Sequence, residues 1–192
     1  MKGAAPVEIR VATVDDIDRM MEVYAEGRLA LGALGIDQWQ EGYPQRWRVE
    51  GDVERGESIV AVDGGIIVGC AMVTGAGETD YDEIDGAWLT ASDSQDPVYA
   101  VVHRVTTAAD ARGAGVASAL FSHAETIARD LGRASLRVDT HPGNVPMQNL
   151  LGKLGYARCG DIVVSCTGDM SPERVAFEKL LAASNVSNGQ GI

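Results

Sequence analysis

The sequence has few cysteines and no long apolar run. Three cysteines in 192 residues, Cys70, Cys159 and Cys166, are too few and too scattered for a disulfide framework or a zinc site. No apolar run approaches the roughly 18 residues of a membrane helix. The first ten residues, "MKGAAPVEIR", lack the apolar stretch of a signal peptide. We therefore expect a cytoplasmic protein that binds neither a membrane nor a metal ion.

Basic residues are scarce as well. The chain has 28 Asp and Glu residues against 16 Lys and Arg residues, which gives a formal net charge of −12. Nucleic-acid binding needs a basic face, so this balance argues against nucleic acid as a partner. No Lys or Arg lies between Gly56 and His103, and five acids there fall in the segment Glu78–Asp85, "ETDYDEID". This acidic segment is either a solvated loop or the mouth of a pocket that attracts cations.

Hydrophobic residues make up 45% of the chain, enough for a core of its own. Their periodicity predicts the element order β-α-α-β-β-β-α-β-α-β-β, typical of a single α/β domain. The domain should span residues 1–181, and residues 182–192 should form a disordered tail because nothing apolar anchors them. The expected strands are 7–13, the two arms of a hairpin over 58–73, 98–107, 135–140, 156–166 and 174–181.

The most informative stretch is "HRVTTAADARGAGVASALF", residues 103–121, in which a strand passes into a helix through Arg112-Gly113-Ala114-Gly115. The first N–H groups of a helix have no intrahelical partner and carry the positive end of its dipole. Glycine lets an anion approach these groups closely. The turn therefore predicts a pyrophosphate on the amides of residues 113–118. The Gly-Lys-Ser/Thr of a P-loop and the third glycine of a Rossmann site are missing, which leaves coenzyme A.

Two motifs resemble those of the GNAT superfamily of N-acyltransferases. They are "Arg112-x-x-Gly115-x-Ala117" after a β-branched strand, and "DTHPGNVPMQNLLGKLGY" with Asn144 and Leu154-Gly155-Tyr156. The resemblance covers about residues 7–181. It implies a mixed central sheet of about six to seven strands with helices on both faces, split between the fourth and fifth strands. Acetyl-CoA would lie in the split as co-substrate.

The resemblance also implies which residues hold the coenzyme. The pantetheine arm would pair with the backbone of residues 105–107, and Asn144 would contact it from the next helix. The pyrophosphate would lie at the glycine-containing turn. The implied binding residues are Val105, Thr106, Thr107, Arg112, Gly113, Ala114, Gly115, Val116, Ala117, Ser118 and Asn144.

Acyl transfer to an amine needs a base, since an alkylamine of pKa about 10.4 is mostly protonated at pH 7. His103 is the first candidate because a histidine titrates near neutral pH. Strict alternation would place it on the same face of the strand as Val105, whose N–H would stabilise the oxyanion. His103 could instead be a core histidine. His141 and Asp139 are the second choices for the base.

One position departs from the family pattern. Leu151 stands where many relatives have the tyrosine that protonates the leaving thiolate, and we expect Tyr156 to pack in the core rather than replace it. The aromatic side chains of Trp39, Tyr43 and Trp88 could wall the acceptor pocket or simply pack in the core. A cysteine nucleophile is disfavoured because no Cys–His pairing is visible.

The sequence thus predicts an N-acetyltransferase that acts on a primary amine through a direct, ternary-complex mechanism. A non-catalytic module that binds acyl-CoA is the alternative, and Leu151 favours it. A nucleotide-dependent oxidoreductase would require NAD binding, which we do not expect. The acceptor, a small molecule or a peptide, is left open, and so is a homodimer.

Overall fold

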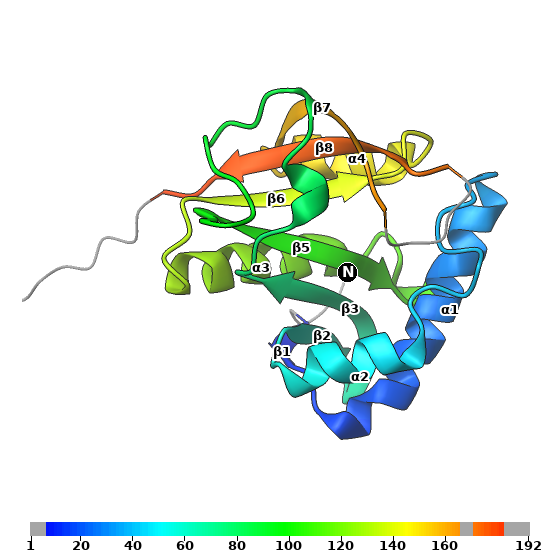
Figure 1. Ribbon diagram of the computed structural model, residues 1–192. Helices are drawn as coiled ribbons and strands as arrows, with labels where there is room; N and C mark the ends of the chain where they lie inside the picture. Colours follow the sequence, from blue (N-terminus) through cyan, green and yellow to red (C-terminus); the bar gives the residue numbers. More distant parts are fainter. Residues whose placement is uncertain (1–6, 166–170, 183–192) are drawn as a thin grey trace, which may run out of the picture.

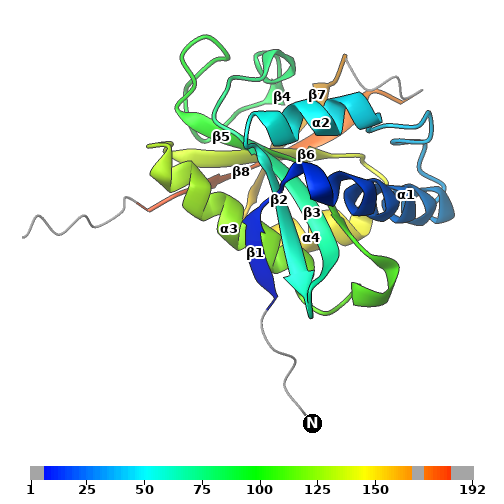
Figure 2. The same cartoon turned by 90° about the horizontal axis from the view of Figure 1, so that it is seen from below.

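The computed structural model describes residues 7–165 and 171–182, which form an eight-stranded sheet with helices on both faces (Figures 1 and 2). The strands are β1 (Glu8–Val11), β2 (Ser58–Asp63), β3 (Ile66–Thr74), β4 (Asp85–Gly86), β5 (Tyr99–Thr107), β6 (Ser135–Thr140), β7 (Ala157–Val163) and β8 (Glu173–Leu180). The helices are α1 (Ile17–Ala33), α2 (Arg46–Glu54), α3 (Val116–Asp130) and α4 (Val145–Lys153). The strand order is β1-β2-β3-β5-β6-β8-β7-β4. Helices α1 and α2 cover one face of the sheet, and α3 and α4 cover the other (Figure 2).

Local sequence signals set the ends of several elements as predicted. Thr13 and Asp16 form a capping box ahead of α1. Gly64 and Gly65 make the turn between β2 and β3 with φ of 56° and 83°, values that favour glycine. The Asn144 side chain accepts a hydrogen bond from a backbone N–H in the first turn of α4 and so begins that helix.

The sheet has eight strands in the described residues, one more than the six to seven predicted. The additional strand is β4, which is two residues long and lies at the end of the acidic segment, paired with β7. A Cβ on Gly86 would overlap the carbonyl oxygen of Cys159, so only glycine permits this pairing. A strand of two residues has no apolar alternation by which the sequence could predict it. It forms because these residues pair with the edge of β7.

Strands β5 and β6 are a parallel pair in a sheet whose other neighbours are antiparallel. Their register covers only Tyr99–Val101 of β5 and Ser135–Arg137 of β6. Beyond these residues the two strands diverge (Figure 1). This is the predicted split between the fourth and fifth strands, because the extra strand β4 shifts the numbering by one.

The sheet divides the core into layers. On the α3 and α4 face, Phe121 and Leu136 belong to the larger buried cluster, and on the α1 and α2 face Met20 and Tyr24 belong to a second. A smaller cluster includes Tyr81 of the acidic segment and packs this segment against the sheet. Both faces of β5 are covered, which explains its almost continuous apolar sequence.

A buried ion pair anchors the connection between β4 and β5. Arg137 of β6 and Glu178 of β8 are fully buried, with Nε and Oε1 3.2 Å apart. Glu178 also accepts a hydrogen bond from the Thr90 hydroxyl, and the Arg137 guanidinium stacks 4.2 Å from the centre of the Trp88 ring. Removing either member would leave an uncompensated buried charge. The pair thereby fixes where residues 87–98 lie.

The extent of the domain stays a prediction. Cys166 and all but the first residue of the predicted tail 182–192 lie outside the described residues. Within residues 7–165 and 171–182, every helix is too short or too polar to cross a membrane.

Candidate active site

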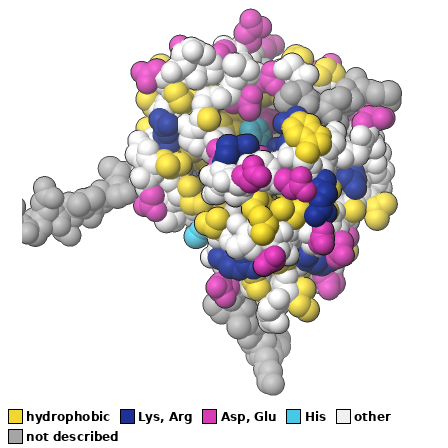
Figure 3. All heavy atoms as spheres, turned by 60° about the horizontal axis from the view of Figure 1, so that its bottom comes forward, with side chains coloured by type: hydrophobic (Ala, Val, Ile, Leu, Met, Phe, Trp, Pro, Cys, Tyr) yellow, Lys and Arg dark blue, Asp and Glu magenta, His cyan; other side chains and the backbone are white. Residues whose placement is uncertain are grey.

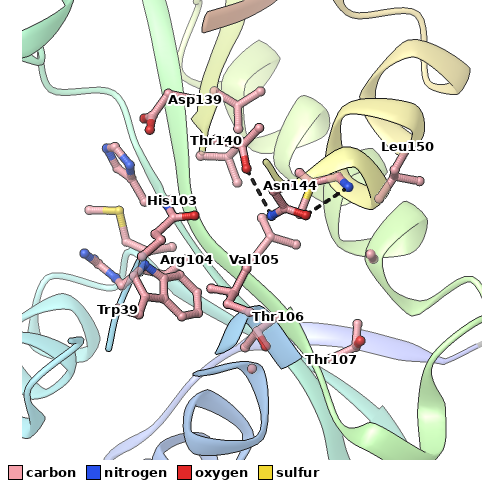
Figure 4. Close-up of a pocket in the computed structure, with 18 of the residues that line it drawn as sticks. Trp39, His103, Arg104, Val105, Thr106, Thr107, Asp139, Thr140, Asn144 and Leu150 are labelled. Carbon is pink, nitrogen blue, oxygen red and sulfur yellow. Dashed lines mark hydrogen bonds between the residues drawn. The ribbon is translucent and has the colours of Figure 1, made fainter. Parts of the chain in front are cut away.

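A cleft of about 1120 Å³ opens where β5 and β6 diverge. Its α3 half is lined by the turn before α3 and by α4, and its α2 half by α2, the segment between α1 and α2, and the acidic segment. Figure 4 shows residues 103–107 of β5 running along the cleft, with His103 and Asp139 toward one end and Asn144 and Leu150 toward the other. The split therefore joins two chemically different compartments.

A β-bulge in β5 shapes the floor of the cleft. The register of β3 and β5 shifts between Cys70 and Met72, so that two β5 residues, Arg104 and Val105, lie opposite one residue of β3. Arg104 takes a left-handed φ of 55°. Beyond the bulge, the alternation of side chains is displaced by one residue.

The bulge corrects the prediction that His103 and Val105 share a face. Val105 packs against the cluster beneath α3 and α4, whereas His103 lies near Tyr81, with ring centres 6.4 Å apart. Arg104 joins His103 in the α2 half. Strict alternation assigns Arg104 to the opposite face, and for that reason the sequence analysis did not predict it as a site residue.

The turn between β5 and α3 has the backbone geometry that its glycines predict. Gly113 and Gly115 have φ of 80° and 85°, and a Cβ on either would meet no other atom within 4 Å. The N–H of Ala119 donates to the Gly115 carbonyl, so the amides of residues 116–118 precede the first bond of the helix. These amides and the open space beside the glycines could hold an anion.

All the predicted phosphate-binding residues except Ala114 line the cleft: Arg112, Gly113, Gly115, Val116, Ala117 and Ser118. Ala114 does not reach it, because its N–H turns inward and donates to the Ala111 carbonyl at 3.2 Å. Arg112 donates through Nη2 to the Glu26 carbonyl of α1 at 2.9 Å. Its side chain thus crosses the rim between α3 and α1.

The predicted residues between the two halves also line the cleft, namely Val105, Thr106, Thr107 and Asn144. Helix α1 approaches β5 closely here, because a Cβ on Gly27 would lie 2.5 Å from the Thr106 hydroxyl oxygen. Asn144 donates through Nδ2 to the Thr140 hydroxyl at 3.1 Å in addition to capping α4 (Figure 4). Its side chain is thereby held at the edge of the cleft.

His103 has a carboxylate partner that the sequence did not single out. Its Nε2 atom lies 3.3 Å from Oε2 of Glu78, the first residue of the acidic segment, and both side chains are half-buried. The hydrogen bond from His103 lowers the pKa of Glu78 below its usual value despite burial. Glu78 is therefore ionised at neutral pH. The acidic composition of the segment was the only signal, and it did not indicate which carboxylate faces the histidine.

Trp39 and Tyr43 line the α2 half, as predicted, with ring centres 6.0 Å apart. Arg104 donates through Nη1 to the Tyr43 hydroxyl at 2.7 Å and pairs through Nη2 with Asp52. Trp39 and Arg104 are the two non-glycine residues with positive φ in the described parts of the chain. Such strain costs on the order of 1–3 kcal/mol and gathers at functional sites.

Trp88, the third predicted wall residue, is not part of the cleft wall. Its indole N–H donates to the Tyr81 carbonyl at 2.9 Å, and its ring packs on Tyr81 with centres 5.1 Å apart. The other face of the ring meets Arg137. The buried ion pair of Arg137 holds Trp88 in the loop that covers β6, so the expectation that it contacts an acceptor is wrong.

Two carboxylates of the acidic segment, Asp80 and Asp82, hold loops in place. Asp80 accepts hydrogen bonds from the N–H and the hydroxyl of Ser165 at 3.0 and 2.6 Å, although it also lines the cleft. Asp82 accepts from the same two groups of Ser94 at 2.7 and 2.6 Å. Glu83 lies by a separate shallow pocket. Glu78 is thus the carboxylate of this segment that reaches the histidine.

The other candidate bases are engaged elsewhere. Asp139 lines the cleft but accepts a hydrogen bond from the Tyr81 hydroxyl at 2.7 Å. The Nε2 atom of His141 lies 3.4 Å from Asp37, and its Nδ1 accepts from a backbone N–H. Both ring nitrogens of His141 are therefore engaged and one Asp139 oxygen is shared with Tyr81, whereas the contact with Glu78 involves Nε2 of His103 and leaves Nδ1 as its second ring nitrogen.

The model of the acetyltransferase (GNAT) family matches residues 17–156, from the start of α1 to the end of the segment that follows α4. This match spans well over half of the chain. The chain belongs to the GNAT family. Its matched region contains the β-bulge, the glycine-containing turn and Asn144.

Solved structures of GNAT proteins agree with this assignment. A GNAT acetyltransferase from Streptococcus agalactiae is 31% identical, with a TM-score of 0.79 over 91% of this chain and 95% of that one. A phosphinothricin acetyltransferase from Sinorhizobium meliloti, in complex with acetyl-CoA, is 17% identical, with a TM-score of 0.68 over 98% and 96%. An N-acetyltransferase from Thermoplasma acidophilum, in complex with coenzyme A, is 15% identical, with a TM-score of 0.64 over 92% and 99%. A comparison with curated proteins finds no match. The predicted GNAT fold is confirmed.

In this GNAT domain, Leu151 and Tyr156 are core residues. Leu151 is fully buried in the cluster beneath α3 and α4. Tyr156 packs its ring on Phe121 with centres 5.6 Å apart, and its hydroxyl faces Glu125. Burial raises the pKa of Tyr156 above its usual value, so its proton is held firmly. Neither residue can protonate a thiolate in the cleft.

Proposed function

We propose that the protein transfers an acetyl group from acetyl-CoA to a primary amine, by direct attack in a complex that holds both substrates. The observation that carries this proposal is the Glu78–His103 pair, which lies at one end of a cleft whose other end is an anion site at the start of α3. Acetyl-CoA and coenzyme A in the Sinorhizobium and Thermoplasma structures support the same co-substrate here.

The coenzyme would be held chiefly by the backbone. The amides of residues 116–118 would donate to its pyrophosphate, and Arg112 would add a positive charge at the rim. The pantetheine arm would lie along residues 105–107, where β5 has no registered partner in β6. Asn144 stands beside this stretch, at the start of α4.

His103 would take the proton that the ammonium form of the acceptor must lose. When Glu78 accepts the Nε2–H of His103, the Nδ1 lone pair is left to receive this proton. The ionised carboxylate then stabilises the imidazolium, as carboxylates do in hydrolase triads. Glu78 is in this sense a positioning residue, and His103 is the base.

The neutral amine then attacks the thioester carbonyl carbon, and a C–N bond forms. The N–H of Val105, at the bulge, would stabilise the oxyanion, and a donor of this kind accounts for about 2.7–4 kcal/mol. Collapse of the intermediate breaks the C–S bond, the attacking nitrogen gives up its second proton to water, and coenzyme A leaves as a thiolate. Because a thiol has a pKa of about 8.5, water suffices to protonate it. A tyrosine in place of Leu151 is not needed.

Thiol release with acetyl-CoA and a panel of primary amines tests the proposal. Release should depend on the amine, and the acetylated amine should appear in equal amount. Binding of acetyl-CoA without any release would favour the alternative, a non-catalytic acyl-CoA-binding module, for which the buried Leu151 is the supporting observation.

We further propose that the protein works in the cytoplasm and binds neither nucleic acid nor membrane. The excess of 28 acidic over 16 basic residues supports this, as do the unpaired thiols of Cys70 and Cys159. A homodimer is compatible with these features.

A further inference from the structure

The basic side chains that line the α2 half are paired, with one exception. Figure 3 shows acidic and basic side chains gathered beside a histidine on the face turned toward the viewer. The pairs are Arg104 and Arg55 with Asp52, Arg55 with Glu57, Arg174 with Asp139, and His103 with Glu78. Arg48 also lines the cleft. Its Nε atom is buried and has no hydrogen-bond partner among the described residues.

Two aromatic rings hold the Arg48 guanidinium in place. Its central carbon lies 5.5 Å from the centre of the Tyr43 ring and 5.0 Å from that of Trp47. Rings stabilise a cation without using its N–H donors. The planar guanidinium is therefore oriented by contacts that leave its donor atoms for an oxyanion.

Arg46, two residues earlier in α2, shows what an ordinary surface arginine does in this helix. It is exposed and makes ion pairs with Asp18 and Glu50 at 2.7 and 2.9 Å. Arg48 is half-buried and has no such partner within residues 7–165 and 171–182. The same wall contains the Nε atom of Arg104, which is buried and unpartnered as well. Arg48 thus has no carboxylate within ion-pair distance in the described chain, although Asp52, which pairs with Arg104, lies near enough to interact with its charge.

We propose that Arg48 binds an oxyanion on the acceptor, so that the acceptor is a primary amine that also carries a carboxylate or a phosphonate. This inference rests on the proposed acetyl transfer and specifies its substrate class. The amine would lie at Glu78 and His103, and the acidic group at Arg48. Opposite charges at the two ends of the pocket would orient a zwitterionic molecule and disfavour a simple alkylamine.

Matched pairs of amines test this substrate class. The probes are glycine, β-alanine, 4-aminobutyrate and L-glutamate, each with the amide of its carboxylate, and 2-aminoethylphosphonate with ethanolamine as its neutral counterpart. With the unmodified protein, the acid of at least one pair should exceed its neutral counterpart in kcat/KM by about 10- to 100-fold, as expected for hydrogen bonds to a charged group. In R48Q the ratio should fall to about one, mainly through KM. R48K should retain part of it, and R46Q should behave like the unmodified protein.

A ratio that is unchanged in R48Q, or neutral amines that are preferred throughout, would overturn the proposal. Calorimetric binding of the same pairs in the presence of coenzyme A separates it from the proposed function. If nothing is acetylated but an acid still binds better than its neutral counterpart, and R48Q removes this difference, the anion site stands and the transfer fails. If acids and neutral amines bind alike while acetylation proceeds, the transfer stands and the anion site fails.

Discussion

The two halves of the cleft are built by different means. The α3 half consists mainly of backbone: two glycines with positive φ, the amides at the start of α3, and the part of β5 that has no partner in β6. The α2 half consists of side chains from separate elements, with Glu78 from the acidic segment, His103 from β5 and Arg48 from α2. Backbone groups do not change when side chains are substituted, so a half built from them suits a ligand that is common to the whole family. A half built from side chains can come to bind a different ligand when those side chains are substituted. We therefore expect the α2 half to select the acceptor.

The largest effect should come from the base in the α2 half. His103→Ala should lower kcat by about 10²–10⁴-fold if His103 takes the proton. The control is His123→Ala, on α3, where His123 does not line the cleft.

The pH profile tests the same residue. The pKa of Glu78 is lowered, so Glu78 remains ionised down to acidic pH and cannot cause a loss of activity near pH 6. An acidic limb of the rate profile that reports on the base should vanish in the alanine variant. A folded variant with a near-normal rate and the same limb would return His103 to a packing role.

The backbone-built half should respond to a glycine substitution. At about 100 times its dissociation constant, acetyl-CoA should stabilise the protein by about 2.7 kcal/mol, and NAD should not. Gly115→Val should abolish this stabilisation, because the side chain occupies the open space beside the amides and the φ of 85° disfavours any side chain.

Gly132→Val separates backbone strain from ligand binding. Gly132 has a φ of 71° with open space around it, and it does not line the cleft. This variant should lose comparable stability in thermal unfolding but keep the shift caused by acetyl-CoA. Equal shifts in both variants would place the pyrophosphate elsewhere.

A carboxylate that supports the fold should behave differently from one in the site. Hydrogen bonds from Arg10 lower the pKa of Asp16 to about 2 from the usual 3.8. Its stabilisation should be complete above the unfolded-state pKa and lost as the pH falls toward 2. Asp16→Asn should cost about 2 kcal/mol of unfolding free energy at pH 7 and nothing near pH 2, without a change in KM. Asp15→Asn, at an exposed neighbour, should cost little at either pH.

The smallest effect should come from the rest of the acidic segment. Neutralising Asp80, Asp82 and Glu83 together would raise the KM of a cationic amine if their field captured it, and salt would weaken that capture as the screening length falls from about 30 to 10 Å. Because Asp80 and Asp82 are bound to serines, we expect their joint neutralisation to reduce stability and to change KM by less than about threefold, since exposed charges contribute little. A larger, salt-dependent change in KM would show that the acidic segment attracts the cationic amine to the pocket.

The sequence predicted the α3 half better than the α2 half for a physical reason. A helix start and positive-φ glycines are local features, so the segment "ARGAGVAS" is enough to predict both the turn and the kind of ligand that it would bind. The position of Glu78 beside His103 depends on how a long connection is anchored, and that anchor is the Arg137–Glu178 pair on two other strands. The same ion pair holds Trp88 against Arg137, away from the cleft wall on which it was predicted to lie.

Alternation and periodicity determined the helices, the strands other than β4, and the glycine-containing turn, because each depends on residues that are close in the chain. The tertiary structure decided the rest. The bulge in β5 exists only where β3 and β5 pair out of step, and it turned Arg104 toward the acceptor side and Val105 away from His103. Only packing showed that Arg48 lacks a carboxylate partner in the described chain, since pairing of charges is a property of side chains that folding brings together.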